Sequence, residues 1–139
     1  NCNIEVAEIS GGSKDNAIPS ISEAVVSCSS IENLDVQCKL LQAEFLNEYY
    51  NIDDNITITV EKTEKTKVFS DESTTRVLTV MNNIPDGIQF MNLELDMPHT
   101  SNNLGVVSTD ENGVSMVCAI RSDIPSKKIE LYSKIESLT

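Results

Sequence analysis

The sequence predicts an α+β fold with a mainly antiparallel sheet, and three observations lead to that prediction. Short stretches in which apolar and polar residues alternate indicate strands with one buried and one polar face, which are typical of antiparallel sheets. Three longer stretches carry apolar residues at helical spacing. The Asn-Gly step within residues 110–113 indicates a hairpin. We therefore expect a sandwich with helices on one face of the sheet, in the order β-β-α-β-α-β-β-β-α.

The first half of the chain is predicted to form three strands and one helix. Short strands are expected over residues 4–9 and 22–28. Ser29, with a glutamate three residues later, indicates a capping box in front of an amphipathic helix over residues 31–50. Isoleucine and valine alternate with threonine over residues 56–60, which predicts a half-buried strand.

The second half is predicted to form a helix, three strands and a closing helix. Ser70 is expected to cap the first of these helices, which ends at the turn over residues 85–87. The alternation of apolar and polar residues then predicts strands over residues 91–97, 104–109 and 114–121. Ser126 is expected to cap the closing helix.

Composition bounds the function. The chain has 139 residues, which predicts a single domain, 1–139, and a formal net charge of −12. Because phosphate binding needs clustered cations, this charge argues against nucleic-acid binding and against docking on an anionic membrane. No apolar run approaches the ~18 residues of a membrane span. The chain begins at Asn1 rather than Met, so we expect it to be a segment of a longer protein.

Histidine and cysteine usage argues against a metal site within the chain. The single histidine, His99, has no neighbours at ligand spacing, and the four cysteines are scattered without a CxxC pattern. Four thiols could pair in three ways in an oxidising compartment, but a chain of this length does not need disulfides. We expect reduced thiols and a cytoplasmic protein. The cysteines are Cys2, Cys28, Cys38 and Cys118.

Three polar places interrupt the pattern and are candidate sites. Residues 10–19 contain paired glycines that allow close backbone approach, and Asn16 could offer its amide to a ligand. Their glycine spacing is not that of a phosphate-binding loop. Residues 98–105 are expected to form a polar loop whose hydroxyls and amides could bind a polar ligand. Arg121 follows a strand, faces away from its apolar residues, and could hold a carboxylate with its guanidinium fork.

Each of these places also has an ordinary structural interpretation, which the local pattern taken alone favours. Residues 10–19 could be a polar loop between strands, and residues 98–105 a long hairpin connection. Arg121 could be a surface arginine paired with Asp123 or another acid. A catalytic Ser-His-Asp arrangement cannot be argued, because one histidine fits many serines equally well.

Four motifs follow one another along the chain. They are ISGGSKDNAIP at 9–19, NIPDGI at 83–88, TSNNLGVV at 100–107 and Arg121-Ser122. In this order and at these spacings they resemble the bacterial aminoacyl-histidine (Xaa-His) dipeptidases, which belong with the carnosinase and aminoacylase-like di-zinc peptidases. The resemblance covers nearly the whole chain. It implies that the chain is most of the inserted lid domain of such an enzyme, with a ferredoxin-like topology.

The resemblance also implies what the chain lacks and what it meets. Two zinc ions would be held by His, Asp and Glu residues of a separate catalytic domain, so this chain alone would be inert. The implied partners are that catalytic domain, a second lid in a homodimer, and an Xaa-His dipeptide substrate. The family's Gly-Gly-His-Ser-Gly segment, which lies just upstream within the lid, is missing from the start of the chain.

Residue by residue, the resemblance assigns substrate contacts. Asn16 corresponds to the lid asparagine that helps to hold the substrate or the tetrahedral intermediate. Arg121 corresponds to the lid arginine that grips the C-terminal carboxylate of the dipeptide. The loop containing Thr100, Ser101 and Asn103 would line the same cleft.

Two positions depart from the family pattern. His99 stands where an acidic or polar residue is expected, which leaves its role open. Ser29 and Ser30 occupy the region where related amidohydrolases carry another arginine, which puts that contact in doubt.

A function of a different class also fits the composition: a free-standing α+β module that binds a partner protein or a small ligand through its sheet.

Overall fold

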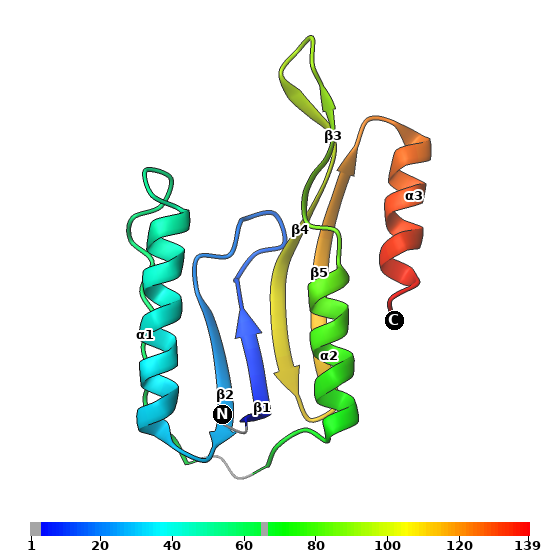
Figure 1. The fold of residues 1–139 in the computed structure, drawn as a ribbon. Coiled ribbons are helices and arrows are strands. Elements are labelled where there is room, and N and C mark those ends of the chain that lie inside the picture. The colour runs from blue at the N-terminus through cyan, green and yellow to red at the C-terminus, as the bar shows by residue number, and fades with distance from the viewer. Residues whose placement is uncertain (1–3, 65–66) are drawn as a thin grey trace. The chain divides into compact units, whose positions relative to one another are not determined.

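The computed structural model describes residues 4–64 and 67–139 and shows an α+β fold, as predicted (Figure 1). Five strands form one sheet in which β4 pairs antiparallel with β1, β3 and β5. The elements in chain order are β1 Ile4–Gly11, β2 Ser22–Cys28, α1 Ile31–Glu48, α2 Asp71–Asn83, β3 Gly87–Asn92, β4 Met97–Asp110, β5 Gly113–Ser122 and α3 Pro125–Glu136.

The chain divides into two compact units. The first unit comprises the residues up to Ala7 together with Val25–Val68. The second comprises Glu8–Ala24 and Phe69–Thr139, and it contains every candidate substrate-contact residue. Strands β1 and β2 therefore each contribute residues to both units.

In the first unit, helix α1 begins at Ile31, as predicted, but its N-cap is not the predicted residue. The N-cap is Ser30 rather than Ser29, since the Ser30 hydroxyl accepts a hydrogen bond from the Asn33 N–H at 3.2 Å. Ser30 has the extended backbone that an N-cap needs, and its hydroxyl also donates to Glu32 at 3.0 Å. The helix ends at Glu48, where the Tyr49 N–H bonds back to the Phe45 carbonyl.

The predicted strand over residues 56–60 is wrong. These residues belong to no strand, although the side chains of Ile56, Ile58 and Val60 are half-buried in alternation with exposed threonines. The Ile58 N–H donates to the Gln42 side chain on α1 at 2.6 Å. The alternation therefore reports which side chains are covered, and it does not require a neighbouring strand.

In the second unit, the cap of α2 is confirmed and the cap of α3 is not. Ser70 accepts a hydrogen bond from the Ser73 N–H at 3.1 Å at the start of α2. Helix α3 begins at Pro125, one residue before the predicted cap Ser126, and its N-cap Ile124 makes no side-chain bond to the helix. Proline suits the first helical position, because it has no N–H to leave unpaired.

The predicted strand over residues 91–97 is also wrong, because a four-residue turn interrupts it. The Asn92 side-chain oxygen accepts hydrogen bonds from the N–H groups of Glu94 and Leu95 at 3.0 and 3.1 Å. Asp96 takes a positive φ of 48°. An asparagine that bonds to the backbone two and three residues later favours a turn over an extended chain, so this local contact overrides the alternation.

The turn leaves large apolar side chains uncovered at the tip of the β3–β4 hairpin. Leu93, Leu95 and Met97 are 89%, 68% and 60% exposed. The core of the second unit lies elsewhere, in Ile84, Val107 and Leu131.

Residues 98–105, predicted to be a loop, lie entirely within β4. Their polar side chains do not prevent a strand, because they find partners inside the protein. The Thr100 and Ser122 hydroxyl oxygens lie 2.8 Å apart across the β4–β5 pair, and the Asn102 amide donates to the Pro85 carbonyl at 2.8 Å. The register with β5 shifts by one residue between Leu104 and Val106, which marks a β-bulge at Gly105.

Three cysteines, Cys28, Cys38 and Cys118, are free and half-buried, and Cys2 lies outside the described residues. None of the helices in the described part of the chain has the length and apolar character needed to cross a membrane.

Candidate functional site

The loop that carries Asn16 is fastened to the middle of β4. The side-chain NH2 group of Asn103 donates one hydrogen bond to the Asp15 carbonyl at 2.8 Å and another to the Ala17 carbonyl at 2.9 Å. These two carbonyls belong to the residues on either side of Asn16. The first and third motifs, more than eighty residues apart in sequence, therefore meet directly.

The second motif meets the same stretch of β4. The Asp86 carboxylate accepts a hydrogen bond from the Leu104 N–H at 2.8 Å, next to the bulge. The Pro85 carbonyl, one residue earlier, accepts the amide of Asn102 at 2.8 Å. The sequence singled out these motifs, but it gave no sign that β4 holds them together.

Two glycines allow the Asn16 loop to lie against the strand. A side-chain carbon on Gly105 would stand 2.6 Å from the Asp15 Cα and from the carbonyl oxygens of Lys14 and Asp15. A side-chain carbon on Gly12, whose φ is +69°, would stand 1.9 Å from the Gly105 oxygen. The close backbone approach expected of the paired glycines is therefore confirmed at Gly12.

Arg121 lies on the same face of the β4–β5 pair as Asn103. Ser101 is directly opposite Arg121, and Asn103 is directly opposite Ala119, two residues from Arg121 on β5. Directly opposite residues of an antiparallel pair point to one face, and diagonal neighbours lie roughly 7–8 Å apart. The Asn16 loop, bound to Asn103, is thus brought to the face that carries Arg121.

The Arg121 side chain is exposed, and within residues 4–64 and 67–139 it forms no ion pair. The ordinary interpretation paired it with Asp123, but the Asp123 carboxylate instead contacts His99. A guanidinium in this state keeps its fork of donors available for a carboxylate.

Thr100 differs from the other predicted site residues. It is 2% exposed, and it points to the opposite face of the strand from Ser101 and Asn103. Its hydroxyl forms a hydrogen bond with the Ser122 hydroxyl, and the Ser122 hydroxyl also accepts a hydrogen bond from the Ile124 N–H at 3.1 Å. Thr100 therefore joins β4 to the start of α3, and the structure does not bring it together with the other four predicted site residues.

Beside Thr100, two lysines of α3 pair with one glutamate, which leaves a net charge of +1 on these three residues. Lys134 and Lys127 each donate to the Glu130 carboxylate, at 2.8 and 2.9 Å. The hydrogen bond from Lys134 and then that from Lys127 lower the pKa of Glu130 to about 2. Lys127 also lies over the Phe90 ring, 5.9 Å from its centroid.

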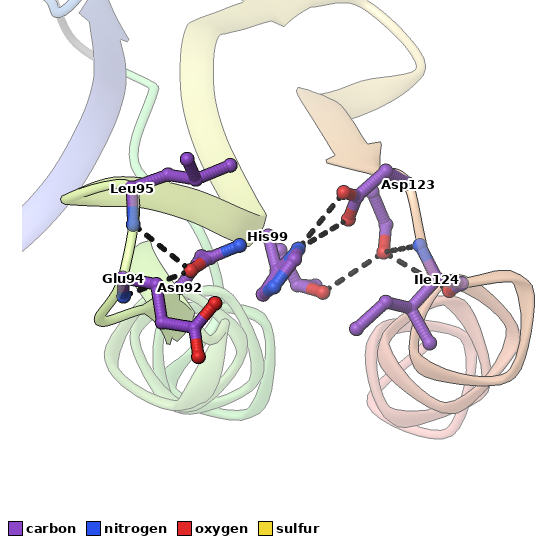
Figure 2. Close-up of polar contacts among 8 residues, drawn as sticks. Asn92, Glu94, Leu95, His99, Asp123 and Ile124 are labelled. Carbon is purple, nitrogen blue, oxygen red and sulfur yellow. Dashed lines mark hydrogen bonds and ion pairs between the residues drawn. The ribbon is translucent and has the colours of Figure 1, made fainter.

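Figure 2 shows the role of His99, which the sequence left open. Its Nδ1 lies 2.8 and 2.9 Å from the two Asp123 carboxylate oxygens, and its carbonyl accepts the Asp123 N–H at 3.2 Å. Its ring stacks on Phe90 with centroids 5.8 Å apart. His99 thus ties β4 to the end of β5 and to β3. Of the described residues, no group of three or more His, Cys, Asp and Glu could hold a metal ion.

One comparison with known proteins finds a similar solved structure. No protein-family model matches the chain, and no curated protein matches it significantly. The crystal structure of an aminoacylhistidine dipeptidase from Vibrio alginolyticus is similar, with a TM-score of 0.86 and 29% sequence identity. The match covers 97% of this chain and 28% of that chain. The chain therefore has the fold of one part of a dipeptidase and spans little more than a quarter of its length.

Proposed function

We propose that this chain is the lid part of a metal-dependent dipeptidase that hydrolyses Xaa-His dipeptides. The similarity of nearly all of the chain to a minor part of an aminoacylhistidine dipeptidase is the observation that carries the proposal. The two units would act together as one lid domain, 1–139. The lid would close over a catalytic domain outside this chain and would contribute to a homodimer.

Within the proposed lid, two side chains would bind substrate. Arg121 would hold the C-terminal carboxylate of the dipeptide in its guanidinium fork, which the described residues leave unpaired. Asn16 would donate its amide to a substrate oxygen, and Ser101 lies on the same face, directly opposite Arg121. Closure of these groups over a substrate would also exclude water from it.

The residues described here do not fit a metal centre. We therefore propose that the two zinc ions of the parent enzyme are bound by the catalytic domain, and that the lid contributes binding and orientation only. Added zinc should accordingly give this chain no dipeptidase activity of its own. Measurable hydrolysis of an Xaa-His dipeptide by the chain with zinc would contradict that division of labour.

The carboxylate contact is tested with Arg121→Ala in the full-length protein. Loss of a charged bidentate contact should cost roughly 2–5 kcal/mol, or about 30- to 5,000-fold in kcat/KM on an Xaa-His dipeptide. The matched control is Arg76→Ala, which removes the other arginine of the sequence from an exposed position on α2. A dipeptide with an amidated C-terminus should be hydrolysed equally by Arg121→Ala and wild type.

An unchanged kcat/KM of Arg121→Ala on the free dipeptide would refute the contact between Arg121 and the substrate carboxylate.

The free-standing interaction module remains a second candidate, favoured by the exposed apolar side chains at the tip of the β3–β4 hairpin. An open reading frame that begins and ends with this chain would contradict the lid proposal and leave that module.

A further inference from the structure

We propose that Asn103 is a positioning residue that fixes Asn16 relative to Arg121, and that it does not itself bind substrate. The inference rests on the proposed function for the roles of Asn16 and Arg121. It assigns a different role to Asn103, which the motif pattern placed among the substrate contacts.

The side-chain donors of Asn103 are both directed at the loop that carries Asn16. A side-chain amide has two N–H hydrogens, and the Asn103 nitrogen lies 2.8 Å from the Asp15 carbonyl and 2.9 Å from the Ala17 carbonyl. Both hydrogens are therefore used within the protein. The Asn103 side chain has no N–H left for a substrate carboxylate or for a developing negative charge.

Among the described residues, few other contacts anchor this loop. All side chains of residues 13–20 are exposed. The backbone contributes a bond from the Ala17 N–H to the Lys14 carbonyl at 3.4 Å, within the loop itself, and one from the Gly12 N–H to the Ile21 carbonyl at 3.1 Å, at its base. The two bonds from Asn103 therefore hold the middle of the loop to the sheet.

The two hydrogen bonds from Asn103 form a clamp around Asn16. Asn103 grips the carbonyls immediately before and after Asn16, so it restrains the backbone on both sides of that residue. Gly105, two residues further on, lies against the backbone of the same loop. Arg121 is a diagonal neighbour of Asn103 on the same face. A fixed loop presents Asn16 and Arg121 at a set separation, which lowers the entropy cost of binding one substrate with both.

The test uses Asn103→Asp in the full-length protein. The substitution keeps the shape, removes both donors and places a carboxylate against two carbonyl oxygens. The matched control is Asn112→Asp, the same change in an exposed hairpin turn. Hydrogen exchange followed by mass spectrometry should show roughly tenfold faster exchange confined to peptides over residues 12–21 in Asn103→Asp only. Asn103→Gln, which keeps the NH2 group, should restore part of the protection.

Kinetics separates positioning from direct contact. We expect Asn103→Asp to lower kcat roughly 10- to 100-fold with KM changed less than about threefold, as Arg121 still binds the carboxylate. In an Asn16→Ala background the same substitution should have no further effect, since Asn103 acts through Asn16. A further loss in that background would show that Asn103 meets the substrate itself and would overturn the inference.

The two failures are distinguishable. Unchanged exchange over residues 12–21 in Asn103→Asp would overturn the clamp whatever the kinetics show. If Asn16→Ala leaves kcat/KM unchanged, the role proposed for Asn16 is wrong, and so is the inference that Asn103 positions it for substrate. Faster loop exchange in Asn103→Asp would then still establish the clamp as a structural contact.

Discussion

The close packing of the Asn16 loop against Gly105 of β4 can be tested with Gly105→Ala, which adds a side-chain carbon at the contact. The added carbon would lie 2.6 Å from three backbone atoms of Lys14 and Asp15, whereas ordinary contact begins near 3.4 Å. The loop must therefore move by about 1 Å against the two bonds from Asn103. Overpacking of this kind costs ~1–3 kcal/mol, and clashing with backbone favours the upper end.

Part of that cost is offset, because replacing glycine by alanine also restricts the unfolded chain, by about 0.4–1 kcal/mol. We expect a net loss of about 2 kcal/mol in the free energy of unfolding, measured by urea titration. The comparison variant is Gly87→Ala, where nothing lies within 4 Å but the backbone φ is +76°. It should also destabilise, by ~1–2 kcal/mol through backbone strain, but without faster hydrogen exchange over residues 12–21.

The loop exchange is the deciding measurement, since both variants lose stability. If Gly105→Ala stays within about 0.5 kcal/mol of wild type and residues 12–21 exchange at the wild-type rate, the loop does not rest on Gly105. In that case Gly105 would not help to fix the position of Asn16, and only the two hydrogen bonds from Asn103 would do so.

Two further predictions follow from burial and charge. Leu131→Ala, at a position that is 4% exposed, should cost ~2–5 kcal/mol in urea titration, whereas Leu93→Ala at the hairpin tip, 89% exposed, should change stability by less than about 0.5 kcal/mol; equal effects would contradict the assigned core. The pKa of Glu130 is lowered from its ordinary value of 4.5 to about 2, so its pairing with two lysines stabilises the protein above pH 4.5 and is lost as the pH falls towards 2. Glu130→Gln should flatten the dependence of the unfolding midpoint on pH in that window at low salt, and a slope as steep as that of wild type would exclude this contribution.

The alternation of apolar and polar residues predicted which side chains are buried better than it predicted which segments pair as strands. Residues 56–60 alternate in burial without belonging to a strand, and the Ile58 N–H donates to the Gln42 side chain on α1. Residues 91–97 alternate equally well, yet the side chain of Asn92 bonds to the backbone and turns the chain. The α+β class survives both errors, because it depends on the helices and on the long β4–β5 hairpin, whose Asn-Gly turn is a local signal.

Local sequence patterns could not predict the clamp that Asn103 forms on the Asn16 loop. Asn103 bonds to carbonyls more than eighty residues away, and a carbonyl carries no residue identity from which a partner could be predicted. His99 is a similar case. Its partner Asp123 lies just beyond the end of the neighbouring strand β5, and which acid comes close to a histidine there depends on the register of β4 and β5.

That register also decides whether the candidate site exists. If the ladder ran regularly from the hairpin turn, Arg121 would lie opposite Asn102, whose side chain is buried. The bulge at Gly105 shifts the register by one residue, so that Arg121 lies opposite Ser101 and shares a face with Asn103. Gly105 therefore has two roles. It leaves room for the backbone of the Asn16 loop, and as the bulge residue it places Asn103 on the same face as Arg121. The sequence showed Asn16 and Arg121 as separate features, and only the bulge makes them parts of one surface.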